Sequence, residues 1–95
     1  MKNYFIVSLC KNGILGGGIT ADEYGLTYRT GKVTVDRKYR NLRMNFEDLA
    51  SVSKGRLFLF PTVTLSMKNG EEYRFIVFFA KKRLMALLHD RKNNL

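Results

Sequence analysis

The residue types that carry most enzyme chemistry are scarce in this chain. There is one cysteine, Cys10, and one histidine, His89. A metal site needs several cysteine, histidine or carboxylate ligands at suitable spacing, whereas these two residues lie at opposite ends of the sequence. A nucleophilic site needs a nucleophile, a base and an orienting group, and the one available set is Cys10, His89 and Asp90. A buried thiol and a solvated helix end explain these residues more simply, so we expect no enzymatic activity, no metal and no cofactor.

The adjacent carboxylates and the glycines are typical of turns and bends. Acidic residues stand side by side at 47–48 and 71–72, where the sequence predicts turns, and such residues are usually solvated. A phosphate-binding loop needs Gly-Lys followed by Ser or Thr, but the pair at 31–32 is followed by Val33. The glycine run 16–18 has no strand-to-helix context. We interpret that run as a bend in a sheet, with a close backbone approach as the alternative.

Basic residues are the first indication of a binding function. The chain has 17 Lys and Arg against 8 Asp and Glu, which gives a net charge of +9. Basic domains attract nucleic acid, anionic lipid headgroups or acidic protein surfaces. Solvated surface is the alternative for every basic segment. Three clusters concentrate the charge: the 37–43 cluster (Arg37, Lys38, Arg40 and Arg43), the 54–56 cluster (Lys54 and Arg56) and the 81–83 cluster (Lys81, Lys82 and Arg83).

Two of these clusters favour binding over plain solvation. The 37–43 cluster is the densest and has Tyr39 among its cations. The 81–83 cluster falls at the start of a predicted helix, where cations oppose the helix dipole. That misfit favours a phosphate or an acidic partner there.

An apolar run is the second candidate contact, formed by Leu57, Phe58, Leu59 and Phe60. We interpret it first as core, buried on both faces of a sheet. If one face is exposed, the run becomes an apolar patch beside the 54–56 cluster, and such patches mark protein or membrane contacts. An exposed run of this kind could enter a bilayer interface or pair two copies of the domain.

The elements that must position these residues are mostly strands. Alternating apolar residues predict six or seven strands, and helical spacing predicts one C-terminal helix from about Ala80 to Arg91. The segment 46–49 is predicted to turn and to place Leu49 in the core. The Asn-Gly pair within 68–71 is the strongest turn signal, and 54–56 is expected to break the pattern. The strand candidates are 4–10, 19–20 with 26–30, a piece at 33–35, part of 37–45, 50–53, 62–67 and 72–79.

The 95 residues are enough for one domain, which we assign to 1–95. Seven short strands with regularly spaced turns predict a curved antiparallel barrel or sandwich, and the amphipathic helix would cap its open corner. One cysteine allows no internal disulfide. The apolar stretch before Cys10 is too short for a signal peptide, and no stretch approaches a membrane span. We expect a cytoplasmic protein, free or peripheral on the inner membrane face.

Several pieces of the chain follow one another in a recognisable order: 17–20 with 25–28, the polar turn 45–52, and 60–61 with the hairpin 65–75, followed by the helix. Taken together, they resemble the GRAM domain of the pleckstrin-homology-like (PH-like) superfamily. The resemblance covers about Tyr4 to His89. It implies a seven-stranded, strongly bent sheet capped by one helix. It also implies a binding module at membranes or in protein assemblies, with no enzymatic activity.

The sequence therefore predicts a non-catalytic module that docks on a protein partner or an anionic membrane surface. The 37–43 cluster would supply electrostatic attraction, and the 57–60 run would add apolar contact. One alternative is a small basic domain that binds nucleic acid, with Tyr39 or Phe58 stacking on bases. Another is an oligomerisation or regulatory module without a ligand. We expect no small-molecule substrate.

Overall fold

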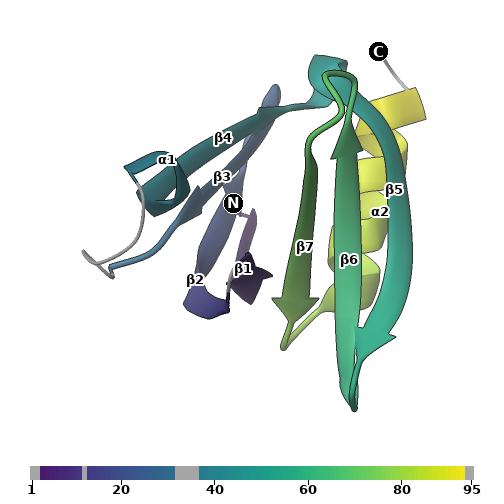
Figure 1. The fold of residues 1–95 in the computed structure, drawn as a ribbon. Coiled ribbons are helices and arrows are strands. Elements are labelled where there is room, and N and C mark those ends of the chain that lie inside the picture. Colours follow the sequence, from purple (N-terminus) through teal and green to yellow (C-terminus); the bar gives the residue numbers. More distant parts are fainter. Residues whose placement is uncertain (1–2, 12, 32–36, 94–95) are drawn as a thin grey trace.

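The structure is a computed structural model that describes residues 3–11, 13–31 and 37–93. Within them, seven strands form one antiparallel sheet in the order β4-β3-β2-β1-β7-β6-β5. The sheet curls into a half-barrel, and the C-terminal helix lies against the β5–β6 side (Figure 1). The expectation of a mainly β fold with a C-terminal helix is confirmed. The strands are β1 (Asn3–Cys10), β2 (Ile14–Ala21), β3 (Gly25–Arg29), β4 (Asn41–Asn45), β5 (Leu49–Leu57), β6 (Phe60–Met67) and β7 (Glu72–Val77).

Three helical segments complete the described chain. A single turn, α1 (Arg37–Arg40), precedes β4, and a 3-10 turn, η1 (Phe46–Asp48), joins β4 to β5. The helix α2 (Lys81–Asn93) follows β7 and places Leu84 and Leu88 in the core. Residues four apart share one helix face, and the predicted C-terminal helix is confirmed, although it begins at Lys81 rather than at Ala80. No helix among the described residues is long and apolar enough to cross a membrane.

The core lies between the two arms of the curled sheet. Alternation along β1 turns Phe5, Val7 and Leu9 inward, where each is at most 1% exposed. Tyr28 of β3 packs across to the other arm of the sheet, because the centroid of its buried ring lies 5.4 Å from the centroid of the Phe75 ring on β7. Further inward residues come from the other strands, from η1 and from α2, including Ile19, Leu49, Val63, Leu65, Met67 and Tyr73. The predicted turn that buries Leu49 and the predicted alternation of β6 are both confirmed.

The glycine run is part of a strand, so the predicted bend is wrong. Gly16, Gly17 and Gly18 all lie in β2 and pair with β1. A Cβ atom at Gly17 would clash with the carbonyl oxygen of Arg29, and one at Gly18 would clash with the side chain of Tyr4. Close approach is therefore the physical reason for these two glycines, which was the alternative interpretation.

Three boundaries also differ from expectation. The segment 54–56 continues β5 rather than breaking it, because its pairing with β6 runs through to Leu57. The strand predicted at 72–79 ends at Val77, and Ala80 takes a φ of 62° that turns the chain into α2. The segment 37–43 begins as the turn α1 and becomes a strand only at Asn41. The piece predicted at 33–35 lies outside the described residues.

Candidate docking surface

The 57–60 run forms the tip of the β5–β6 hairpin, and its interpretation as core is wrong. Phe58 and Leu59 make the turn and are 86% and 90% exposed, while Phe60 is 47% exposed. The cause is tertiary: β6 pairs with β7 only from Thr62 onward, so the hairpin projects beyond its neighbour. Phe58 adopts a φ of 57°, which a bulky residue seldom adopts. The hairpin thus presents two large apolar side chains to solvent at its end.

The link from β7 to α2 brings two further aromatic rings to this tip. Phe78 is 43% exposed and Phe79 is 68% exposed, although the sequence placed both in the predicted strand 72–79. The Phe78 ring packs edge-on against the Phe60 ring, with 6.1 Å between their centroids. Figure 1 shows the hairpin tip and the β7–α2 link at the same lower end of the molecule. Sequence reasoning missed these rings because β7 ends two residues earlier than its pattern suggests.

Two of the three basic clusters lie at this end. Lys54 and Arg56 are exposed on β5, two positions apart and therefore on the same face of the strand, just before the tip. Lys81 and Lys82 open α2 directly after the aromatic link, and the first turn of this helix has no acidic residue. We call this surface the apolar–basic end, defined by Phe58, Leu59, Phe60, Phe78 and Phe79 with Lys54, Arg56, Lys81 and Lys82.

Arg83 belongs to the same cluster in sequence but has a structural role. Its guanidinium donates a hydrogen bond of 3.1 Å to the carbonyl oxygen of Tyr4. It also lies 4.8 Å from the centre of the Phe5 ring, within the range of a cation–π contact. Arg83 therefore holds the start of α2 against β1 through these two contacts.

Most described carboxylates lie at the other end of the β5–β6 hairpin. Glu47 and Asp48 are in η1, from which the nine residues of β5 run to the tip. The β2–β3 turn reaches the same place, since Phe46 donates a backbone hydrogen bond to the carbonyl oxygen of Tyr24. The carboxylates are therefore concentrated away from the apolar–basic end, and such an arrangement favours the approach of that end to an anionic surface. The carboxylates at the other end are Asp22, Glu23, Glu47, Asp48, Glu71 and Glu72.

The 37–43 cluster does not join the apolar–basic end. Its strand β4 is one edge of the sheet, and β5 is the opposite edge. Tyr39 is buried, with 7% exposed, and Arg43 pairs with Asp22 of the β2–β3 turn at 2.8 Å. Arg43 also donates a 3.0 Å hydrogen bond to the hydroxyl of Thr27. The side chains of Arg37 and Lys38 lie outside the described residues.

The Asp22–Arg43 pair predicts a small pH-dependent contribution to stability. Hydrogen bonds from Arg43 hold the pKa of the Asp22 carboxyl well below its usual range, and the backbone N–H of Tyr24 adds to this effect. The stabilisation is complete above the ordinary aspartate pKa of about 3.9 and is lost as the pH falls from there through the lowered pKa. Because the pair is solvent-exposed, Asp22→Asn should lower the free energy of unfolding by about 0.5–1 kcal/mol at neutral pH.

Urea unfolding of the wild type and Asp22→Asn at a series of pH values measures this contribution. The difference between the two proteins should shrink steadily between about pH 4 and about pH 2. A difference that stays constant over this range would show that the carboxylate charge contributes nothing. The asparagine amide oxygen can still accept the turn hydrogen bonds from Tyr24 and Gly25, so the variant isolates the charge.

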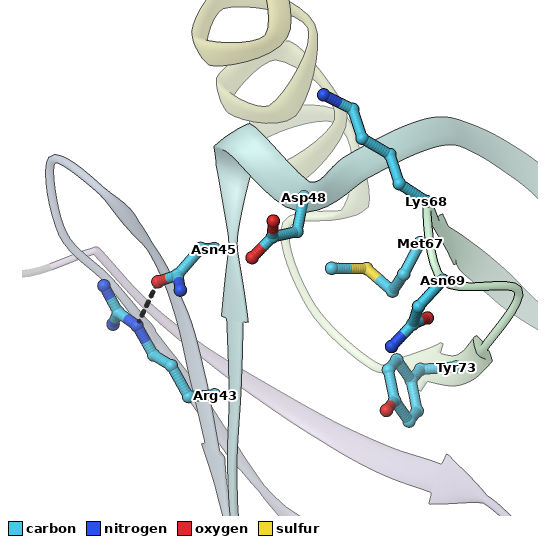
Figure 2. Close-up of a pocket in the computed structure, with 7 residues that line it drawn as sticks. All are labelled: Arg43, Asn45, Asp48, Met67, Lys68, Asn69 and Tyr73. Carbon is cyan, nitrogen blue, oxygen red and sulfur yellow. Dashed lines mark hydrogen bonds between the residues drawn. The ribbon is translucent and has the colours of Figure 1, made fainter.

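A polar cavity of about 450 Å³ opens at the carboxylate end, away from the tip. Figure 2 shows Asn45 and Asp48 on one side of it and Asn69 and Tyr73 on the other. The Arg43 Nε donates a 2.9 Å hydrogen bond to the Asn45 side chain at its border. Sequence reasoning missed this cavity because the lining is spread over β4, η1, β6, the β6–β7 turn and β7. Its full lining is Arg43, Asn45, Asp48, Met67, Lys68, Asn69 and Tyr73.

The lining of this cavity mixes both signs of charge, Arg43 and Lys68 with Asp48, beside the amides of Asn45 and Asn69, so it indicates no single class of ligand. Within the described part of the chain, the residues that could act as a nucleophile or as metal ligands do not form a site either. Burial raises the pKa of the Cys10 thiol despite the nearby Arg74, so the thiolate needed for nucleophilic attack is disfavoured. The described residues contain no group of three or more His, Cys, Asp or Glu placed to hold a metal ion.

Comparisons with known proteins agree with the fold and add no activity. No family model matches the sequence, and no curated protein matches it. The structure is similar to the crystal structure of the C-terminal domain of an unknown protein from Leishmania infantum, with a TM-score of 0.75. The similarity covers 94% of this chain and 81% of that one at 8% sequence identity. At so low an identity the likeness shows the fold alone: a curled antiparallel sheet with a C-terminal helix.

Proposed function

We propose that this chain is a PH-like binding module that docks on an anionic membrane surface and catalyses no reaction. The seven-stranded curled sheet and its C-terminal helix support the PH-like assignment, because this is the arrangement that the GRAM resemblance implies. The observation that carries the docking proposal is the exposure of Phe58 and Leu59, 86% and 90%, between two basic clusters.

Peripheral attachment to a bilayer needs an apolar and an electrostatic contribution to the binding free energy, and the apolar–basic end can supply both. Each apolar side chain removed from water contributes about 1.5–3 kcal/mol when its burial is complete. Each Lys or Arg near an anionic surface contributes about 1 kcal/mol. Neither contribution alone gives stable attachment, whereas apolar and electrostatic contributions together do. The tip would enter the boundary between headgroups and acyl chains while Lys54, Arg56, Lys81 and Lys82 contact lipid phosphates.

The nucleic acid alternative loses one of its two stacking residues. Tyr39 is 7% exposed, so its ring is not free to stack on a base. Phe58 is exposed, but its neighbours at the tip are apolar side chains rather than a ring of arginines. This composition fits the interface of a bilayer better than a nucleic acid strand.

The basic residues beside the tip give a prediction that separates this surface from the 37–43 cluster. Lys54→Gln with Arg56→Gln should weaken binding to anionic vesicles about 30-fold, since about 2 kcal/mol of attraction is lost. The matched control, Arg37→Gln with Arg40→Gln, removes the same charge from α1 and should weaken binding only a few-fold. Vesicle co-sedimentation measures both. If the control loses more binding than the tip variant, the docking surface lies at α1 and the proposed surface is wrong.

A further inference from the structure

Apolar side chains continue from the hairpin tip onto the outer face of the sheet. Alternation along β1 turns Phe5 inward and leaves Tyr4 and Ile6 on the outer face, where they are 53% and 49% exposed. The same face carries Phe60 of β6 and Phe78 beside the end of β7. We call these four residues, Tyr4, Ile6, Phe60 and Phe78, the outer strip.

Contacts between neighbours make the outer strip continuous across the sheet. Phe60 and Phe78 are in edge-to-face contact. The backbone N–H of Phe78 donates a 3.3 Å hydrogen bond to the carbonyl oxygen of Ile6, so these residues are neighbours on adjacent strands. Tyr4 follows at the next outward position of β1, and its ring lies over Gly18 of β2. The strip therefore runs from the tip across β6, β7 and β1 to β2.

The four residues of the outer strip are uncharged, and the strip has a defined border. Gly16 and Gly18 leave β2 without a side chain opposite Ser8 and Ile6, and the Tyr4 ring fills the space over Gly18. Ile76 is only 2% exposed although alternation turns it away from the core, so its neighbours on the outer face cover it. Beyond Ile76 the face becomes polar, with a hollow of about 220 Å³ that Thr64, Glu72 and Arg74 help to line.

We infer that the outer strip lies on the bilayer together with the tip, so that the domain docks on its side rather than standing on the hairpin. This inference rests on the proposed function. Its occupant is the anionic lipid surface, because the strip is continuous with the tip and because Lys81 and Lys82 come directly after the aromatic link that carries Phe78. Tyr4 suits this strip, since its ring is apolar and its hydroxyl can reach water or headgroups.

Tryptophan reporters test the orientation cleanly, because the natural chain has no tryptophan. Four single variants of the full chain are needed: Phe58→Trp for the tip, Phe78→Trp and Ile6→Trp for two strands of the strip, and Tyr24→Trp as control. Tyr24 is 73% exposed and lies at the carboxylate end. Emission is recorded with vesicles of equimolar phosphatidylglycerol and phosphatidylcholine, with and without brominated acyl chains, after circular dichroism has confirmed the fold of each variant.

The inference predicts a blue shift and bromine quenching at the tip and at both strip positions, with no change at Tyr24→Trp. A response at Phe58→Trp without one at Phe78→Trp and Ile6→Trp overturns the strip and leaves docking by the tip in place. No response at any position overturns the proposed function as well. A concentration-dependent blue shift of the strip reporters without vesicles would place a second copy of the chain on the strip and would also overturn the inference.

A double variant without tryptophan reporters measures independently how much the outer strip contributes to vesicle binding. Threonine has a high β-propensity, so Ile6→Thr with Phe78→Thr suits positions in and beside the strands while it removes apolar area from the strip, and binding to the same vesicles should fall about tenfold. Unchanged binding of this folded double variant would overturn the strip, whereas the wild-type binding measured beside it reports on the proposed function alone.

Discussion

Replacing Phe58 and Leu59 together by serine is expected to weaken binding to anionic vesicles by about a hundredfold or more. The two side chains are almost fully exposed, so they contribute little to the core and are free to leave water at a lipid interface. Removing both loses about 3 kcal/mol of apolar transfer free energy, which corresponds to more than two orders of magnitude in the partition coefficient. The measurement is co-sedimentation or fluorescence titration with vesicles of equimolar phosphatidylglycerol and phosphatidylcholine.

The matched control for this variant is Tyr24→Ser. Tyr24 is 73% exposed but lies at the carboxylate end, so its loss should leave vesicle binding unchanged. The thermal stability of the Phe58→Ser, Leu59→Ser protein should stay within about 0.5 kcal/mol of the wild type, because exposed substitutions away from the core seldom exceed this. Equal vesicle binding by the double variant and the wild type would show that the tip is not the docking element.

Gly17→Ala is expected to destabilise the fold by about 2–3 kcal/mol, the largest stability effect that the structure predicts for one added methyl group. The new Cβ would clash with the carbonyl oxygen of Arg29 and press on the ring of Tyr28. Neither can yield easily, since Arg29 is paired within β3 and Tyr28 is fully buried. For a domain of this size the loss corresponds to a decrease in Tm of roughly 10–20 °C.

Gly16→Ala is the matched control, one position earlier in the same strand. The nearest atom to its added Cβ is the Ser8 hydroxyl oxygen at 3.9 Å, an ordinary van der Waals contact. Its change in stability should be at most about 0.5 kcal/mol in either direction. Thermal unfolding of the two variants decides the matter: equal losses would show that the run provides chain flexibility rather than room for β3.

Sequence reasoning predicted the strands and the helix because their periodicity reflects local burial. The alternation of Val63, Leu65 and Met67 and the helical spacing of Leu84 and Leu88 are consequences of which face meets the core, and both are confirmed. The glycine run could not be assigned in this way. Its meaning depends on Arg29 and Tyr4, which come beside it only when β1, β2 and β3 pair.

The candidate site was less predictable, because exposure depends on where a neighbouring strand stops. Nothing in the 57–60 sequence indicates that the pairing of β6 with β7 begins only at Thr62. The apolar run was therefore interpreted as part of the core. Charge density was also misleading. The densest cluster contains Arg43, whose partner Asp22 lies 21 positions earlier, so that cation is already paired. The sparser clusters at 54–56 and 81–83 meet at the tip through tertiary structure alone.

The most direct test is binding of the wild-type protein to vesicles of pure phosphatidylcholine and of equimolar phosphatidylglycerol and phosphatidylcholine, each at low and at physiological salt. The apolar tip and the basic residues beside it predict strong binding to the anionic vesicles at low salt, weaker binding at physiological salt, and little binding to the neutral vesicles. Absence of binding to anionic vesicles at low salt, where attraction is greatest, would contradict membrane docking and leave a protein partner or self-association as the use of the apolar–basic end.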